Sequence, residues 1–393
     1  MNKSGWLLSV AAVVASTAGA SADTDYRAAV LRVDLPNRPP PISRLDAPPV
    51  DAGFAGATLA TADNATTGSF MKQKFTTETV VATPDTAVAE MQELLDAGIW
   101  WIVVLADEGT TVKLADLAGD KALVLNARAT DDRLRAEDCR PNLLHTAPSD
   151  AMLTDAVAQY LVWKRWTDWF LIEGSHPEDK ALADAYRRAA RKFGAEIVEE
   201  RVFEDTGGAR RSDSGTVKVQ EQMPAFTQRA AEHDVVVAAD RSDVFAVLLP
   251  YHAWEPRPVV GSAGLVPGSW HPSHEAWGAT QFQTRFEKQA NRPARDEDYQ
   301  VWVALRALGE AATRTQGGDF AAIHDFVLSD QFDLAAFKGQ KLTFRRWDGQ
   351  LRQPILLTTD RTVVSVSPQA EFLHQVSQLD TIGIDEPEST CNR

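Results

Sequence analysis

Polar residues that follow apolar strand runs are the residues of this chain best suited to binding chemistry. In "LVLNARATDD" the run "LVL" is followed by Asn126, Arg128 and Thr130. Open parallel sheets bind ligands outside the carboxyl ends of their strands. A guanidinium at such a point can hold a ligand carboxylate through two parallel hydrogen bonds, which makes Arg128 a candidate anion-binding residue. The alternative is an ion pair with nearby Asp131 or Asp132.

Other strand ends offer candidates for the same site. Ser149 precedes a helical pattern, so its hydroxyl and the amides of that helix N-terminus can bind an anion. Arg241 has the same ambiguity as Arg128, because Asp240 and Asp243 lie beside it. Trp270 lies in a loop-like stretch and can stack on a flat ligand, with packing as the alternative. The remaining candidates are Thr110, Thr111, Lys113, Ser175, His176 and His271.

Signals for catalysis and for metal binding are absent from the sequence. It contains no G-x-S-x-G, H-E-x-x-H, Walker or G-x-G-x-x-G motif. His271 and His274 are separated by Pro272, which disfavours a helical metal-binding pair. We therefore expect no catalytic residue, no metal and no enzyme activity.

Alternating strands and helices must position these residues. Strands are predicted at 28–35, 77–82, 100–105 and 122–125, with helices at 54–63, 86–97 and 111–118 between them. The pattern restarts after a strand at 143–146, with helices that include 178–193, 217–231 and 242–254. This predicts an α/β fold of two doubly wound parallel-sheet lobes joined by a hinge. The predicted divisions are a signal peptide at 1–22, lobe 1 at 23–146 plus 271–353, and lobe 2 at 147–270 plus 354–393.

Composition and the first residues indicate an exported protein. Lys3, an apolar run to Ala20 and the small residues Ala20 and Ala22 form a signal-peptide pattern. The formal net charge of −15 argues against nucleic-acid binding, because phosphates would be repelled. Two cysteines, Cys139 and Cys391, favour one disulfide in an oxidising compartment, with two free thiols as the alternative.

Two loops have unusual compositions. "LPNRPPPISRLDAPPVDAG" is rich in proline and long for an ordinary connection, which often indicates a functional loop. "EDTGGARRSDSGT" is polar and glycine-rich, and we expect it to be mobile.

The order of these elements resembles that of a known family. "LVLNARATDD", "NLLHTAPSDAMLTDAVAQYL", "WFLIEG" and "FGAEIVEERVF" together resemble the crossover region of type I periplasmic binding proteins, the branched-chain amino acid and amide receptors of ABC importers. "DYQVWVALRALGEAATR" resembles their late lobe-one helix, and "FKGQKLTFRRWDGQLRQPILL" resembles their closing strands. The resemblance implies a periplasmic receptor that closes on a small molecule and delivers it to a membrane permease.

A subgroup of that family is a closer match. "ATADNATTGSFMKQKF", "GLVPGSWHPSHEAWGATQFQTRF" and "FRRWDGQLRQPILL" resemble receptors associated with the quinoprotein alcohol dehydrogenase system. For these, the implied ligand is pyrroloquinoline quinone (PQQ), a flat aromatic molecule with three carboxylates. The amine of Lys113 is a candidate for reversible addition to a quinone carbonyl.

The chain also departs from amino-acid receptors. "ADEGTT" places Asp107 and Glu108 where those receptors offer serines to a ligand carboxylate, and "EGSHPED" lacks their Tyr-Gly pair. These differences disfavour a leucine-like ligand. Two other hypotheses remain: an amino-acid or amide receptor of the same fold, and an accessory protein that docks on a quinoprotein dehydrogenase.

Overall fold

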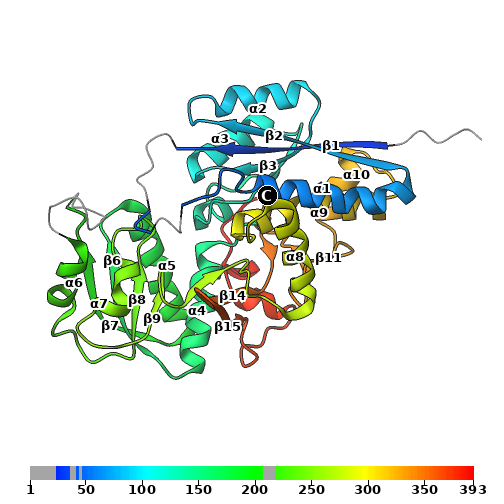
Figure 1. Ribbon diagram of the computed structural model, residues 1–393. Coiled ribbons are helices and arrows are strands. Elements are labelled where there is room, and N and C mark those ends of the chain that lie inside the picture. The colour runs from blue at the N-terminus through cyan, green and yellow to red at the C-terminus, as the bar shows by residue number, and fades with distance from the viewer. Residues whose placement is uncertain (1–23, 36–40, 44–46, 207–217) are drawn as a thin grey trace, which may run out of the picture.

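The protein forms two lobes in a computed structural model that describes residues 24–35, 41–43, 47–206 and 218–393. In Figure 1, one lobe contains β1–β3 and the other contains β6–β9. The predicted signal peptide and most of the glycine-rich loop lie outside the described residues. Within the described part of the chain, no helix is long and apolar enough to cross a membrane.

Lobe 1 is built on a parallel sheet whose strand order is β2-β1-β3-β4-β5. Val30 and Val103 pack on one face of this sheet, whereas Leu31 and Val104 pack on the other. This period-two alternation buries both faces, as a parallel sheet between helices requires. The strands are β1 (Thr24–Val33), β2 (Gln73–Ala82), β3 (Trp101–Leu105), β4 (Leu123–Asn126) and β5 (Leu143–His145).

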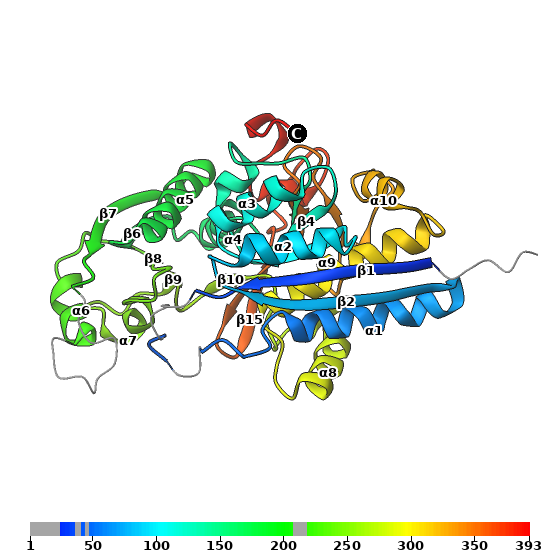
Figure 2. The same cartoon turned by 90° about the horizontal axis from the view of Figure 1, so that it is seen from above.

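Two groups of helices cover the two faces of this sheet, one above it and one below it in Figure 1, and Figure 2 looks down on the upper group. The first face packs against α1 (Phe54–Met71), α8 (Ala279–Ala290) and α9 (Asp296–Arg314). The second face packs against α2 (Ala87–Asp96) and α3 (Glu108–Ala118). The sequence patterns predicted α1, α2 and α3, and the observed α1 extends beyond its predicted end at residue 63. A short helix, α10 (Phe320–Val327), packs beside α9.

Lobe 2 repeats this architecture with a parallel sheet in the order β7-β6-β8-β9. One face packs against α4 and α5, and the other packs against α6 and the short helices η3 and α7. The strands are β6 (Asp168–Gly174), β7 (Glu196–Phe203), β8 (Val235–Ala239) and β9 (Val259–Gly261). The helices are α4 (Asp150–Trp163), α5 (Pro177–Phe193), α6 (Val219–Thr227), η3 (Ala246–Leu248) and α7 (Leu249–His252).

The long helix predicted at 242–254 is wrong. The Asp240 carboxylate accepts hydrogen bonds from the backbone N–H groups of Val244, Phe245 and Ala246 at 2.6–3.1 Å. Asp243 also adopts a positive φ of 56°. The side chain therefore folds this segment into a tight turn, and only short helices follow it.

Two small antiparallel sheets complete the fold. The sheet of β10 (Val266–Gly268), β14 (Ile355–Thr359) and β15 (Thr362–Ser367) packs against α4. The other contains β11 (Leu334–Ala335), β12 (Lys341–Phe344) and β13 (Leu351–Arg352), and Gln350 beside it bridges to His145 of β5. The chain passes between the two cores at three crossing segments, namely residues 146–149, 269–270 and 353–354.

The predicted disulfide between Cys139 and Cys391 is confirmed. The two Cα atoms are 5.8 Å apart, although 252 positions separate the residues in sequence. The bond therefore attaches the C-terminal segment to the part of lobe 1 between β4 and β5.

The two α/β sheets with their helices match the predicted fold class. The precise lobe boundaries stay a prediction.

Candidate functional site

The carboxyl ends of the lobe 1 strands lie beside the start of α4 in lobe 2. The Asp150 N–H donates to the Thr130 carbonyl oxygen at 2.7 Å, and the Ala151 N–H donates to Asp132 Oδ1 at 2.9 Å. The proline-rich loop also reaches lobe 2, because the Ile42 N–H donates to Asp243 Oδ2 at 3.1 Å. These contacts bring the start of α4 and the proline-rich loop to the junction beside the ends of the lobe 1 strands.

Arg128 is held by lobe 1. Its Nε donates to Glu297 Oε1 at 2.7 Å, and its Nη1 donates to the carbonyl oxygens of Val33 and Leu105 at 3.0 and 2.9 Å. The sequence offered Asp131 or Asp132 as alternative ion-pair partners of Arg128, and this prediction is wrong. Arg128 pairs instead with Glu297 at the start of α9. Arg128 therefore ties together the ends of β1 and β3, and a role in ligand binding would require it to exchange these partners.

Asn126 forms the turn that carries Arg128. Its Oδ1 accepts the N–H groups of Arg128 and Ala129 at 3.1 and 2.9 Å, and its Nδ2 donates to the Ala129 carbonyl oxygen at 2.7 Å. The side chain has no exposed surface. The expectation that Asn126 contacts a ligand directly is therefore corrected to a structural role in the turn. Thr130 is only partly buried, and its carbonyl oxygen is engaged with Asp150 as described above.

The start of α3 is capped by an acidic residue. Asp107 accepts the Thr110 N–H at 2.9 Å and the Thr110 hydroxyl at 2.8 Å. Thr111 is fully buried, and its hydroxyl has no partner within the described residues. Lys113 is exposed on the helix surface. The carboxylate of Asp107 thus takes the place that a ligand anion could occupy at this helix terminus.

Arg241 and the start of α4 form a second charged group. Ser149 caps α4 by accepting the Met152 N–H at 3.2 Å. Arg241 Nη2 donates to the carboxylate of Asp150, which is almost fully buried. Burial lowers the pKa of Arg241, but the charge and hydrogen bond of Asp150 outweigh this effect and the net pKa is raised. Arg241 is therefore charged and paired, with 27% of its side chain exposed at the junction.

Ser175 and His176 lie at the end of β6 and contact one acid. Ser175 Oγ accepts the Asp205 N–H at 3.1 Å, and His176 Nε2 lies 2.9 Å from Asp205 Oδ2. The hydrogen bond to Asp205 raises the pKa of His176. The same histidine is the N-cap residue of α5, and Asp179 accepts the His176 N–H at 3.3 Å.

Trp270 belongs to the core of lobe 1. It stacks on Tyr299 with ring centroids 4.8 Å apart, and its Nε1 donates to Gln283 Oε1 at 3.0 Å. Only 3% of its surface is exposed, so the expected stacking on a ligand is corrected to packing. His271 is partly exposed and has Nδ1 2.7 Å from Ser273 Oγ. Burial lowers the pKa of His271, which favours its neutral form.

Several backbone N–H groups at the starts of helices already donate hydrogen bonds to carboxylates of the chain itself. As described above, Asp107 caps α3, Asp179 caps α5, and Asp240 holds the amides before η3. Asp132 takes an amide at the start of α4 in the same way. An anionic ligand would therefore need cationic side chains. Among the predicted site residues, Arg128 and Arg241 supply them beside the acids described above, whereas Lys113 is exposed on the surface of α3.

The pKa of Asp132 is raised to about 6, first by burial and then by the negative charge of Asp150. Because the folded protein holds this proton more tightly, the contribution of Asp132 to stability is complete below pH 3.8 and is lost as the pH rises through about 6. We expect Asp132→Asn to remove this loss, which amounts to about 1.4 kcal/mol for each unit of pKa shift. The free energy of unfolding in urea, measured from pH 4 to 7, tests this. Asp131→Asn is the matched control, and an unchanged profile in Asp132→Asn would contradict the prediction.

A buried polar network fixes the three crossing segments. Lys338 Nζ donates to the carbonyl oxygens of Ser269 and Pro354, and Gln353 Nε2 donates to the Thr146 carbonyl oxygen at 2.8 Å. Asp296 Oδ1 accepts the N–H and hydroxyl of Ser269, each at 2.7 Å. The sequence prediction missed these residues, because nothing local distinguishes them from surface lysines, glutamines and aspartates. Within the described residues, no group of three acidic, histidine or cysteine side chains is arranged to hold a metal ion.

Comparisons with known proteins agree with this architecture. A family model described as "Periplasmic binding protein" matches residues 55–210. Among curated proteins, none matches the chain. A branched-chain amino acid ABC transporter periplasmic ligand-binding protein from Burkholderia xenovorans is similar in structure, with 15% identity and a TM-score of 0.69 over 87% of this chain and 95% of that one.

Two other solved structures are similar to the same degree. One is the leucine-, isoleucine-, valine-, threonine- and alanine-binding protein from Brucella ovis in a closed conformation, with 15% identity and a TM-score of 0.67 over 91% of this chain and 93% of that one. The other is an R. palustris ABC transporter solute-binding protein in complex with benzoate, with 13% identity and a TM-score of 0.64 over 93% and 99%. These similarities show that the chain has the type I periplasmic binding protein fold, as its sequence predicted.

Proposed function

Starting from this fold, we propose that the chain is the periplasmic substrate-binding protein of an ABC transporter. It binds a small molecule at the junction between its lobes and delivers it to the transporter permease. The observation that carries the proposal is the convergence of strand ends from both lobes around the start of α4, with crossing segments that can act as a hinge. It acts by binding and release, and no catalytic step is assigned to it.

The ligand that we propose is PQQ. Support comes from the sequence resemblance to receptors associated with quinoprotein alcohol dehydrogenases. The geometry adds a condition, because Arg128 is paired with Glu297 and Arg241 with Asp150. The carboxylates of PQQ must displace one of these acids from its arginine. Arg241 is the better candidate, because Arg128 also supports two backbone carbonyl groups.

An amino acid or another small carboxylate is the second candidate ligand. The observation that favours it is the set of similar structures, which includes a Desulfitobacterium hafniense protein in complex with leucine and the benzoate complex described above. Each of these ligands carries a single carboxylate, which Arg241 alone can hold.

An accessory role on a quinoprotein dehydrogenase predicts copurification with that enzyme and no ligand binding.

Titration of the purified protein with PQQ tests the proposal, with tryptophan fluorescence and quinone absorbance followed together. We expect saturable binding near one to one. Arg241→Gln should weaken binding by about tenfold or more, since a hydrogen bond to a charged group contributes about 1.5–3 kcal/mol. Asp150→Asn should strengthen binding, because it releases the Arg241 guanidinium from its acidic partner.

The opposite signs of these two effects distinguish ligand binding from general damage to the fold. Arg257→Gln is the matched control, since Arg257 is a more exposed arginine of lobe 2 that pairs with Glu255. An absence of PQQ binding at tens of micromolar protein would refute the PQQ assignment. Parallel titrations with leucine and benzoate would then test the second candidate.

A further inference from the structure

The C-terminal segment of the chain lies across the junction of the lobes. Beyond β15 it contains two short helices, η5 (Gln378–Thr381) and η6 (Glu386–Glu388). We call residues 378–393 the C-terminal strap. Its contacts fall into three groups, first with lobe 2, then with the turn between β12 and β13, and finally with lobe 1.

The strap is fixed to α4 and α5 of lobe 2 through Thr381, Ile382 and Gly383. Ile382 is fully buried in the lobe 2 core. The Gly383 N–H donates to Asp155 Oδ2 at 2.9 Å, and Lys192 Nζ donates to the Gly383 carbonyl oxygen at 2.9 Å. Gln159 Nε2 donates to Thr381 Oγ1 at 2.9 Å. These contacts fix this part of the strap to lobe 2.

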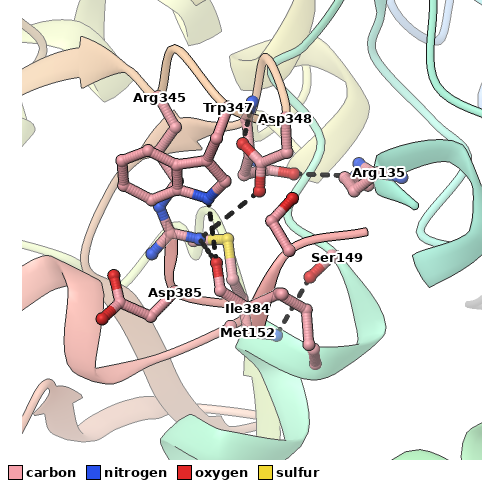
Figure 3. A network of polar contacts seen from close by, with 12 residues as sticks. Arg135, Ser149, Met152, Arg345, Trp347, Asp348, Ile384 and Asp385 are labelled. Carbon is pink, nitrogen blue, oxygen red and sulfur yellow. Dashed lines mark hydrogen bonds and ion pairs between the residues drawn. The ribbon is translucent and has the colours of Figure 1, made fainter. Parts of the chain in front are cut away.

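The turn between β12 and β13 holds the middle of the strap. Figure 3 shows Arg345, Trp347 and Asp348 of this turn beside Ile384 and Asp385. Arg345 Nη2 donates to the Ile382 carbonyl oxygen at 2.8 Å, and Trp347 Nε1 donates to the Ile384 carbonyl oxygen at 3.2 Å. The same turn is joined to lobe 1, because the His145 N–H donates to the Gly349 carbonyl oxygen at 2.9 Å.

The end of the strap is fixed to lobe 1 by a covalent bond. Cys391 forms the disulfide with Cys139, and Arg393 Nη2 donates to the Pro141 carbonyl oxygen at 2.8 Å. The neighbouring Arg140 forms an ion pair with Asp116 of α3. This end of the strap therefore moves with lobe 1.

We propose that the C-terminal strap is a fourth, covalently closed connection between the lobes, which limits how far they can open. Three crossing segments alone allow two lobes to rotate about a hinge. A segment attached to both lobes must lengthen or detach when they separate. The chain between Ile384 and Cys391 contains η6, so opening can unwind this turn but cannot exceed the reach of the extended chain, about 3.3–3.6 Å per residue.

Pulsed electron–electron spectroscopy on the protein without ligand tests this proposal. Nitroxides are attached to p-acetylphenylalanine at positions 70 and 251, which leaves the cysteines free to form the disulfide. Phe70 on α1 is 86% exposed and Tyr251 on α7 is 90% exposed, so both positions tolerate a label. We expect Cys139→Ser with Cys391→Ser to shift the distance distribution between the labels toward longer distances.

A second variant releases the other end of the strap and keeps the disulfide. Lys192→Met with Thr381→Val removes two of its contacts with lobe 2 and should give a shift in the same direction. Lys341→Met, which removes an exposed ion pair with Asp333, is the control and should leave the distribution unchanged. Distributions identical to that of the unmodified protein in both folded variants would overturn the proposal. Because no ligand is used, this outcome is independent of the proposed function.

Discussion

Arg345→Met is expected to lower the free energy of unfolding by about 3–5 kcal/mol, because it removes one partner of a buried ion pair. The Arg345 side chain is 1% exposed, and its Nε donates to Asp380 Oδ1 at 2.9 Å. Its other nitrogens donate to backbone carbonyl oxygens of the strap, including those of Leu379 and Ile382 at 3.1 and 2.8 Å. Methionine fills much of the same space but leaves the backbone carbonyl oxygens without this donor, and Asp380 keeps only Arg352 as an ion-pair partner.

The neighbouring arginine provides a matched control. The Arg346 side chain is 59% exposed and pairs with the exposed Asp330 at 3.1 Å. Arg346→Met should therefore change stability by about 1 kcal/mol or less, as is usual for a surface ion pair. Urea unfolding of the oxidised proteins, followed by tryptophan fluorescence, measures both effects. Similar losses in the two variants would show that burial of Arg345 is not the cause.

Lys338→Met is expected to remove a large pH dependence of stability. Lys338 is 1% exposed, and burial lowers its pKa from the ordinary 10.5 to about 7. The unfolded chain therefore binds more protons than the folded chain between these values, so stability rises with pH across that window. The slope is at most about 1.4 kcal/mol per pH unit. The contribution is complete above 10.5 and is lost as the pH falls through about 7.

The surroundings of Lys338 explain this behaviour. A neutral amine has two N–H groups, which match the carbonyl oxygens of Ser269 and Pro354. Asp296 on α9 raises the pKa of the amine but does not outweigh burial. The centroid of the Tyr299 ring lies 5.1 Å from Lys338 Nζ. The pKa of His274 is lowered mainly by burial and secondarily by the charge of Lys338.

Urea unfolding at several pH values between 7 and 9.5 measures the slope. Burial raises the pKa of Tyr299 and Tyr186, so these side chains stay neutral in the folded protein within this range. The absolute stability of Lys338→Met also reflects two carbonyl groups left without a donor, and the slope is therefore the informative quantity. Lys341→Met, at a lysine whose side chain is 75% exposed, should keep the wild-type slope. If Lys338→Met keeps the same slope of the free energy of unfolding against pH, groups other than Lys338 cause the pH dependence.

The architecture of the two α/β sheets could be predicted from the sequence, and the count of two cysteines favoured the disulfide that the structure contains. Apolar runs such as Trp101–Leu105 and Val235–Ala239 are buried along their whole length, and helical patterns follow them at regular intervals. These signals are local, because the period of a strand or helix is set by neighbouring residues. The helix predicted at 242–254 failed because one side chain, Asp240, competes for the backbone amides that a helix would need.

The exposure and the partners of the polar residues could not be predicted in this way, because they depend on contacts between distant segments. Arg128 pairs with Glu297, which is 169 positions away, and Trp270 stacks on Tyr299 from another segment of the chain. Lys338 and Arg345 are charged residues that the sequence alone would place in solvent, yet contacts from distant segments bury both. Pairing of this kind depends on how elements pack rather than on the residues beside each position, which is why the strand ends were predictable and the roles of their side chains were not.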